Sequence, residues 1–176
     1  MQAVHDEVLA FSMVKEEELL RATEEIQNLT YRQGEYKIFK VFEPKERLIM
    51  ALPFYDRVVQ HMICNAIQPV FENGFYYHSY ACRSGKGMHA ASDTLYQWMY
   101  ETEVKQGLRM YAFKGDISKY FASIPHDKLK DENRRYIGDK KALMLMDDII
   151  DHNGILPDGV GIPVGNLTSQ LFANVY

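Results

Sequence analysis

Cysteine is scarce in this 176-residue sequence: only Cys64 and Cys82 are present, with no paired spacing. This excludes a disulfide framework and offers no pattern for a structural zinc site. The sequence also has no run of about 18 apolar residues, and its first thirty residues carry acids where a signal peptide would have a basic start and an apolar centre. We therefore expect a cytoplasmic protein that does not bind a membrane.

The sequence has no excess of positive charge either: it contains 20 Lys and Arg and 24 Asp and Glu, which gives a net charge of −4. This balance argues against a protein that holds nucleic acid by bulk charge alone. The charges are unevenly spread: residues 1–34 hold three bases and seven acids, whereas residues 35–90 hold seven bases and five acids. The middle of the chain is its basic part. Since 47% of the residues are hydrophobic, we expect a folded chain with a core.

Apolar periodicity predicts helices over much of the chain. The expected helices comprise one or two surface helices within residues 5–28, a buried helix over 56–71, a helix over 88–104, two polar-faced helices over 125–136 and 139–150, and an apolar helix from residue 168. In the helix over 88–104 we expect four apolar side chains to point inward, namely Ala91, Leu95, Trp98 and Met99. Four glycines and two prolines predict turns over 154–165.

Two short stretches are typical of strands. Apolar runs on both sides of Glu43-Pro44-Lys45-Glu46 predict a β-hairpin over residues 35–52. Residues 111–117 alternate, with Asp116 near the end of a short expected strand. Open α/β sheets bind ligands at that end, and hard cations prefer carboxylates, so Asp116 is a candidate metal ligand. An aspartate that accepts hydrogen bonds from a turn is the alternative for this stretch alone.

Four blocks of sequence follow one another in a fixed order. They are Lys40 with 47–60 (RLIMALPFYDRVVQ), 79–91 (SYACRSGKGMHAA), the stretch around Asp116, and 161–174 (GIPVGNLTSQLFAN). Together they resemble the fingers and part of the palm of a bacterial retroelement reverse transcriptase, over roughly residues 35–176. The third and fourth blocks are similar to polymerase motifs A and B. Met146-Asp147-Asp148 looks like motif C but precedes motif B, so we expect Asp147 and Asp148 on a helix surface.

The resemblance implies an α+β fold and the activity of an RNA-directed DNA polymerase. Residues 1–110 would form N-terminal helices and fingers, and residues 111–176 the first half of a right-hand palm. The reaction transfers nucleotides from deoxynucleoside triphosphates to a primer 3′ end, and two Mg²⁺ ions stabilise the attacking and leaving oxygens, with Mn²⁺ as a substitute. By resemblance Asp116 is the motif A ligand, and the backbone carbonyl of Ile117 adds a second oxygen.

The resemblance also implies residues that bind the substrates. Arg47 and Lys40 would contact the triphosphate from the hairpin. Arginine suits this role because its guanidinium fork binds two phosphate oxygens at once. Phe121 would lie under the sugar and exclude a 2′-hydroxyl. Val164 and Gly165 would line the nucleotide site. Five residues would contact template or primer: Arg57, Arg83, Lys86, Ser169 and Gln170. The alternatives are solvated surface charges for the basic residues and an apolar core position for Phe121.

The sequence departs from the family pattern in two ways. Most reverse transcriptases have Gln-Gly and Ser-Pro in motif B, where this chain has Val164-Gly165 and Ser169-Gln170. That variant is similar to the enzymes of diversity-generating retroelements; group II intron and retron enzymes are the alternative subgroups. Motif C and a thumb are absent before Tyr176. We therefore expect the 176-residue chain alone to be inactive.

Expected partners are an RNA template, a DNA or RNA primer and deoxynucleoside triphosphates. A basic accessory protein would complement the acidic charge of the chain. The rival hypothesis is a non-catalytic module that binds RNA or protein and retains a polymerase-like fingers domain.

Overall fold

The structure is a computed structural model that describes residues 2–42 and 46–176. Contacts divide the chain into two units: unit 1 comprises residues 1–74 and 120–176, and unit 2 comprises residues 75–119. The predicted division at residues 110 and 111 does not coincide with these units. The reason is that helices from the first and second halves of the chain share one core, since α3 (Phe54–Glu72) packs against α8 (Leu167–Val175).

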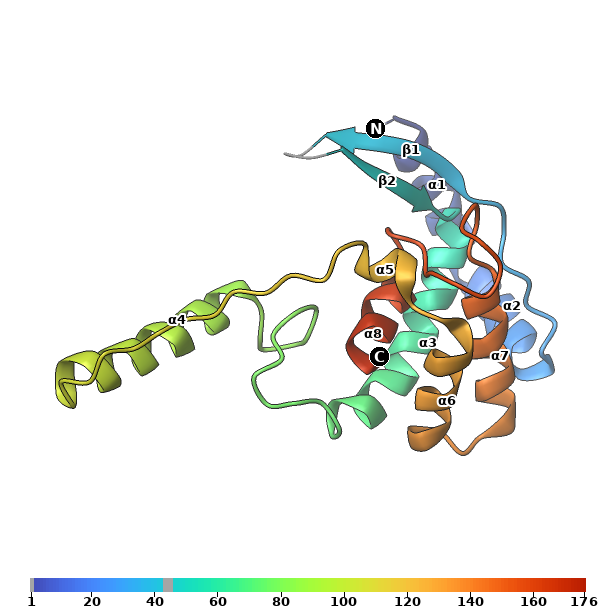
Figure 1. Ribbon diagram of the computed structural model, residues 1–176. Coiled ribbons are helices and arrows are strands. Elements are labelled where there is room, and N and C mark those ends of the chain that lie inside the picture. Colours follow the sequence, from blue (N-terminus) through green and yellow to red (C-terminus); the bar gives the residue numbers. More distant parts are fainter. Residues whose placement is uncertain (1, 43–45) are drawn as a thin grey trace. The chain divides into compact units, whose positions relative to one another are not determined.

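Unit 1 consists mainly of helices, and Figure 1 shows α8 and α7 close to α3. Besides α3 and α8 its helices are α1 (Gln2–Met13), α2 (Lys15–Asn28), α5 (Tyr120–Ser123), α6 (His126–Tyr136) and α7 (Lys140–Asp151). All the helices that the periodicity predicted in this unit are present, with ends shifted by at most two residues where a single helix was expected. None of the described helices is long and apolar enough to cross a membrane.

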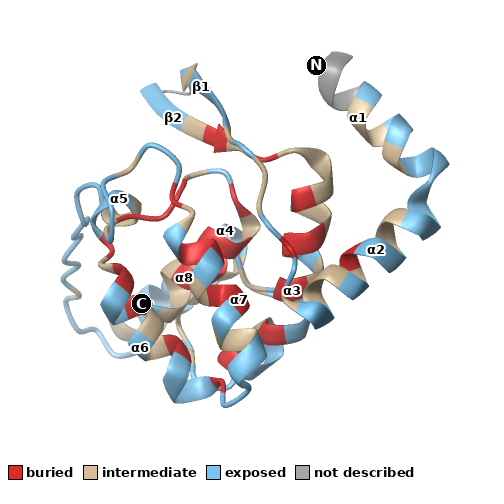
Figure 2. Ribbon diagram, turned by 90° about the vertical axis from the view of Figure 1, so that its right-hand side faces the viewer, coloured by how far each residue is buried: buried red, intermediate tan, exposed pale blue. Residues whose placement is uncertain are grey.

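The core of unit 1 lies where α3, α7 and α8 meet (Figure 2). In α3 the buried side chains Val59, Ile63, Ile67 and Phe71 recur every four residues, which places them on one face of the helix. Helix α7 starts at an N-cap, because the side chain of Asp139 accepts a 2.8 Å hydrogen bond from the backbone N–H of Ala142.

Asp56, in α3, anchors the segment that connects α2 to the hairpin. Its buried carboxylate accepts hydrogen bonds from the Tyr31 hydroxyl (2.7 Å) and from the backbone N–H of Gly34 (3.2 Å). The two donors lie 25 and 22 residues before Asp56. Asp56 belongs to the first of the four blocks, and the structure gives it a structural role.

The predicted hairpin is confirmed. Strands β1 (Lys37–Phe42) and β2 (Glu46–Ala51) pair antiparallel, with Lys40 opposite Leu48 and Val41 opposite Arg47. The predicted turn residues 43–45 lie outside the described residues. This hairpin is the one sheet in the described part of the chain, which is therefore rich in helix with a small sheet.

The prediction of a strand over residues 111–117 is wrong. This segment of unit 2 is irregular and exposed, and Phe113 is 97% accessible. A strand forms only when its backbone groups pair with a neighbour, and no described segment pairs with this one. The alternating pattern is present, but the partner that would make it a strand is not among the described residues.

Unit 2 contains the helix α4 (Met88–Met99), continued by the π-helical segment η1 (Tyr100–Lys105). The helix itself was predicted, but the prediction of which side chains it buries is wrong. Leu95, Trp98 and Met99 are all exposed, and no described residue of unit 2 is fully buried. So short a unit cannot cover a helix that is apolar on several sides.

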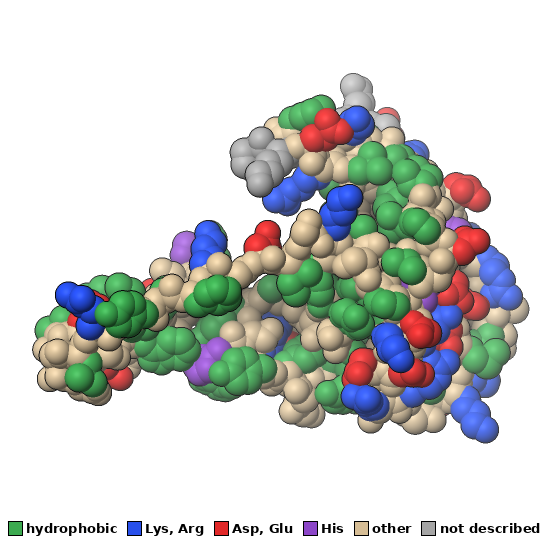
Figure 3. Space-filling model, in the orientation of Figure 1, with side chains coloured by type: hydrophobic (Ala, Val, Ile, Leu, Met, Phe, Trp, Pro, Cys, Tyr) green, Lys and Arg blue, Asp and Glu red, His purple; other side chains and the backbone are tan. Residues whose placement is uncertain are grey.

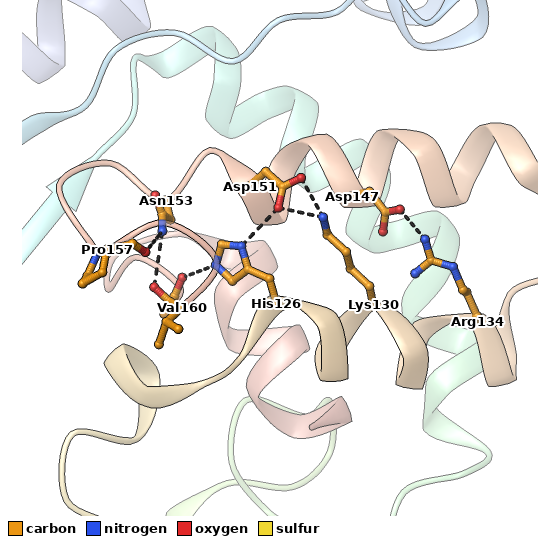
Figure 4. A network of polar contacts seen from close by, with 9 residues as sticks. His126, Lys130, Arg134, Asp147, Asp151, Asn153, Pro157 and Val160 are labelled. Atoms are coloured by element: carbon orange, nitrogen blue, oxygen red, sulfur yellow. Dashed lines mark hydrogen bonds and ion pairs between the residues drawn. The ribbon is translucent and has the colours of Figure 1, made fainter.

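Ion pairs hold α6 against α7 (Figure 4). Lys130 pairs with Asp151 at 2.6 Å, and Arg134 pairs with Asp147. Both ring nitrogens of the buried His126 face acceptors, Asp151 Oδ1 at 3.1 Å and the Gly161 carbonyl at 2.8 Å. Burial raises the pKa of the Asp151 carboxyl, but hydrogen bonds from Lys130 and His126 outweigh it and leave that pKa below its usual value. The prediction that Asp147 and Asp148 lie on a helix surface is confirmed for Asp148, which is exposed, whereas Asp147 is only partly exposed.

The turns over 154–165 are also confirmed, and side chains organise them. Figure 4 shows Asn153 pointing at Pro157 and Val160. Its side-chain amide donates to both backbone carbonyls, at 2.8 and 3.3 Å. These bonds fold the loop back on itself and lead the chain into the glycine turn of residues 161–166 (GIPVGN).

Candidate functional site

The glycine turn lies along the outer edge of β2. The backbone N–H of Met50 donates a 3.0 Å hydrogen bond to the Val164 carbonyl. Gly165 has a φ of +124°, and a Cβ there would lie 3.0 Å from the Met50 carbonyl oxygen and 3.2 Å from Ile49 Cγ2. Any larger residue would therefore be both strained and crowded. This explains why a glycine follows Val164 and why the turn and the hairpin lie together.

The hairpin presents its two candidate phosphate ligands on opposite faces. Side chains alternate along a strand, and residues directly opposite one another share a face. Arg47 thus shares its face with Val41 and Ile49, whereas Lys40 lies on the other face, where it pairs with Glu46 at 2.7 Å. Because Gly165 approaches the Ile49 side chain, the glycine turn lies nearer to the face of Arg47. The geometry favours Arg47 over Lys40 as a ligand of anything bound beside the turn.

A pocket of about 170 Å³ lies between the start of α3, the glycine turn and the start of α8. Its lining brings together three residues that the sequence predicted to bind substrates, Arg57, Gly165 and Gln170. Gln60 and His61 line it as well. Gln60 is only 1% exposed, and its Oε1 has no hydrogen-bond partner among the described residues. A buried acceptor without a partner suits a pocket that receives a polar ligand.

Two side chains outside the pocket lining also contact Arg57. Its guanidinium lies 3.6 Å from the Glu7 carboxylate and 5.2 Å from the centroid of the Phe54 ring. A hydrogen bond from Lys37 lowers the pKa of Glu7, so that carboxyl stays ionised beside Arg57 at neutral pH. These contacts limit the rotamers open to Arg57 where it lines the pocket.

A polar network centred on Tyr36 joins the hairpin to the residue after Gly165. The Tyr36 hydroxyl accepts from Gln33 Nε2 (2.7 Å) and from Asn166 Nδ2 (2.8 Å), and donates to the His152 carbonyl (3.0 Å). Burial raises the pKa of Tyr36 to about 12. The Gln33 side chain in turn accepts from Gln60 Nε2 at 3.0 Å, so the network reaches the pocket.

Sequence reasoning assigned no role to Tyr36, Gln33, Gln60 or Asn166. Gln60 and Asn166 lie within the blocks that carry the resemblance, and a polar side chain inside an otherwise apolar run was the available signal. Tyr36 and Gln33 gave no such signal, because their other partners, Gln60, His152 and Asn166, are distant in sequence. Their contribution is to hold the site in shape.

Phe121 is connected to the same turn by a backbone hydrogen bond. It is half-buried in α5, and its backbone carbonyl accepts a 2.9 Å hydrogen bond from Ile162, two residues before Val164. The N–H of Gly161 bonds to the Ile124 carbonyl at 2.7 Å. The structure thus places Phe121, Val164 and the Arg47 face of the hairpin around one turn of unit 1.

The other three predicted template or primer contacts are Ser169, Arg83 and Lys86. Ser169 is buried within α8, so its hydroxyl is not available to a nucleic acid. Arg83 and Lys86 belong to unit 2 and support the local loop. The Arg83 guanidinium donates to the carbonyls of Tyr76 (3.0 Å) and Ser79 (2.9 Å), and the Lys86 ammonium donates to the Tyr77 carbonyl.

Asp116 and Ile117 also lie in unit 2, and both are exposed. The described residues contain no group of three or more His, Cys, Asp or Glu side chains that could hold a metal ion. A site for two Mg²⁺ ions needs several oxygen ligands around each ion. The described residues therefore do not form such a site by themselves, and Asp116 offers one carboxylate toward it.

Comparison with known proteins gives two distant relatives, and no protein-family model matches the chain. Over 126 residues the chain is 29% identical to Protein YkfC of Escherichia coli (strain K12), covering 68% of this chain and 32% of that protein. It is also 29% identical over 126 residues to the uncharacterized 91 kDa protein in cob intron of Schizosaccharomyces pombe (strain 972), covering 69% of this chain and 15% of that protein. The aligned part of the chain thus corresponds to about a third and about a seventh of these two longer relatives.

Proposed function

We propose that this chain is the fingers and the first part of the palm of an RNA-directed DNA polymerase. In the complete protein it would help to transfer nucleotides from deoxynucleoside triphosphates to a primer 3′ end on an RNA template. One observation carries the proposal: two consecutive elements meet a turn that is distant in sequence, and together they present residues suited to a nucleotide in unit 1. They are the hairpin with Arg47, the start of α3 with Arg57, and the glycine turn with Val164 and Gly165.

The chemistry of these residues suits a nucleotide beside the turn. Arg47 would bind phosphate oxygens through its planar fork, and it lies on the face toward the turn. Gly165 lets the turn lie close against β2, and it lines the pocket in which Arg57 and Gln170 would face the ligand. Phe121, held to the same turn by Ile162, would contact the sugar and exclude a 2′-hydroxyl.

Asp116 and the Ile117 carbonyl are proposed as ligands for Mg²⁺, or Mn²⁺ in its place. The ion would neutralise phosphate charge and activate the primer hydroxyl. The described residues do not complete this site, so its remaining ligands would have to come from elsewhere in the complete protein.

The relatives are compatible with a retroelement enzyme. The name of the fission-yeast relative places it in an intron, which fits the group II intron subgroup. Val164 and Gln170 resemble the diversity-generating subgroup instead. We propose the second subgroup, with group II intron and retron enzymes as the alternatives, because Val164 belongs to the turn that bonds to β2 and Gln170 lines the pocket beside it.

Primer extension by the complete protein that carries this chain tests the proposal. With an RNA template, a DNA primer and Mg²⁺, the parent should extend the primer and Asp116→Asn should not. The amide is nearly isosteric but neutral, and charge at such a site carries most of the rate enhancement. Asp93→Asn, an exposed aspartate of the same unit, is the matched control. If Asp116→Asn stayed within about tenfold of the parent, or about 1.4 kcal/mol on the barrier, Asp116 would not be a metal ligand.

A second candidate is a non-catalytic module that binds RNA or protein. It is favoured by the lack of a metal-holding group among the described residues. The same experiment separates the two hypotheses, because such a module would bind RNA but would extend no primer in its complete form.

A further inference from the structure

Unit 2 carries a cluster of aromatic rings around His78. The His78 ring lies 4.9 Å from that of Tyr77, 5.7 Å from Tyr76, 6.2 Å from Tyr80 and 4.7 Å from Trp98, measured between centroids. We call these five residues the aromatic cluster. Figure 3 shows hydrophobic side chains, histidine and basic side chains together on the surface of this unit.

Hydrogen bonds hold the inner rings of the aromatic cluster in place. The Tyr80 hydroxyl donates to Thr94 Oγ1 at 2.8 Å, and His78 Nδ1 lies 3.0 Å from the same hydroxyl. Since the Tyr80 hydroxyl donates its proton to Thr94, His78 Nδ1 is the donor in its bond to the Tyr80 oxygen. Arg83 fixes the backbone beneath by bonding the Tyr76 and Ser79 carbonyls. The cluster is thus ordered before any ligand arrives, which lowers the entropy cost of binding.

The outer rings of the aromatic cluster are open to solvent. Tyr76 is 74% exposed and Tyr77 is 72% exposed, although both are edge-packed against His78. Neighbouring exposed rings on an ordered support are a common platform for stacking bases. Isolated exposed tyrosines are ordinary on protein surfaces, but grouped rings with positive charge beside them are typical of a binding surface.

Positive charge accompanies these rings. Lys86 Nζ lies 3.9 Å from the centroid of Tyr77 and 5.1 Å from that of Tyr80. Residues 75–92 contain two bases and no acid, and unit 2 as a whole holds six Lys and Arg against four Asp and Glu, in a chain whose net charge is −4. An anionic ligand is therefore favoured here more than over the rest of the chain.

We propose that the aromatic cluster binds single-stranded RNA, with bases stacked on Tyr76 and Tyr77 and a phosphate beside Lys86. The inference deepens the proposed function, on which the choice of RNA rests, and it assigns the contact to tyrosines that the sequence did not single out. Arg83 acts as a positioning residue, because its guanidinium is engaged with the backbone. The Lys86 ammonium also donates to the Tyr77 carbonyl, but it has three N–H donors and can bind a phosphate as well. A protein partner would also cover exposed rings, but an acid-free segment with a cation against one ring suits a ligand that has both phosphates and aromatic faces.

Fluorescence anisotropy with the 176-residue chain tests this directly. The probe is a fluorescein-labelled uridine oligomer of about 12 nucleotides, compared with an abasic oligomer of the same length and charge. The double variant Tyr76→Ala/Tyr77→Ala should bind the uridine oligomer at least about thirtyfold more weakly and should no longer distinguish it from the abasic one. Tyr96→Ala removes an equally exposed tyrosine (70%) of the same unit and should bind like the parent.

The double variant Tyr76→Phe/Tyr77→Phe keeps both rings and should keep the binding, and circular dichroism confirms that every variant is folded. Equal affinity of the parent and the alanine variant, or equal affinity of the parent for the two oligomers, would overturn the proposal. So would light scattering that showed the alanine variant losing self-association rather than RNA affinity. The binding measurement does not depend on DNA synthesis. Failure of this proposal, seen in RNA binding, is therefore distinct from failure of the proposed function, seen in primer extension by the parent and by Asp116→Asn.

Discussion

Asn166 donates a 2.8 Å hydrogen bond to the hydroxyl of Tyr36, although the two residues are 130 positions apart. Asn166 follows the glycine of the turn, and Tyr36 immediately precedes β1. The same hydroxyl also bonds Gln33 and the His152 carbonyl. This half-buried oxygen, together with the bond between Met50 and Val164, therefore holds the hairpin against the glycine turn, and with it Arg47 near Val164.

Removing that oxygen should destabilise the chain. Tyr36→Phe leaves the side-chain amides of Gln33 and Asn166 and the His152 carbonyl without their partner, at a cost of about 1–3 kcal/mol for unsatisfied buried groups. Urea denaturation of the parent and the variant measures the difference. Tyr96→Phe, which removes an exposed hydroxyl, is the control and should change stability by less than about 0.5 kcal/mol. Equal midpoints for Tyr36→Phe and the parent would show that the network contributes little.

Stability should fall at alkaline pH. Burial raises the pKa of Tyr36 from 10 to about 12, so the unfolded chain ionises before the folded one. The contribution is complete below pH 10 and is lost as the pH rises toward about 12, with a slope of up to about 1.4 kcal/mol per pH unit. Urea denaturation across this range should give a shallower slope for Tyr36→Phe. Part of the slope should remain, because burial also raises the pKa of Tyr31 and of the Cys64 thiol.

The two faces of the hairpin should differ in function. In the complete protein Arg47→Ala should reduce the efficiency of nucleotide use about tenfold to a hundredfold, because a charge-assisted contact contributes about 1.5–3 kcal/mol. Lys40→Ala, on the opposite face and paired with Glu46, should change it less than about threefold. Primer extension over a range of nucleotide concentrations distinguishes them. Weakened RNA binding with unchanged nucleotide dependence would instead make Arg47 a template contact.

Val164 should lower copying fidelity. A glutamine there could hydrogen-bond the nucleotide in the pose that a correct base pair permits, whereas valine cannot. Discrimination is a difference between two transition-state free energies, and losing such a contact would narrow it by about 1–2 kcal/mol, or roughly five- to thirtyfold in error frequency. Val164→Gln in the complete protein should therefore misincorporate less, most clearly opposite template adenines.

The backbone of residue 164 should tolerate that change, because its carbonyl is held by the Met50 N–H whatever the side chain. Sequencing of complementary DNA from both variants on one template gives the error spectra. Identical spectra from equally stable and equally active proteins would refute the role of Val164.

The 176-residue chain by itself should not extend a primer. Two-metal catalysis needs several carboxylates at one site, and no described group of residues provides three potential ligands. The measurement is extension of a labelled primer on an RNA template by the purified chain with Mg²⁺ or Mn²⁺. Template-dependent products from a nuclease-free preparation would show that this expectation is wrong.

The sequence alone determined which segments are helical and where the hairpin forms. Apolar residues at four-residue spacing place Val59, Ile63 and Ile67 on one face of α3, and this depends only on the geometry of a helix. It also supplied the four blocks and hence the candidates Arg47, Asp116 and Val164. Periodicity is local information, so neighbouring residues suffice to reveal it.

Tertiary structure decided what those local patterns become. The alternation in residues 111–117 did not make a strand, because a strand needs a partner and periodicity cannot supply one. The register of the hairpin, and not its composition, placed Lys40 and Arg47 on opposite faces. The hydrogen bond between Tyr36 and Asn166 joins positions 130 residues apart, and only the packed chain brings such distant polar groups within reach of one another.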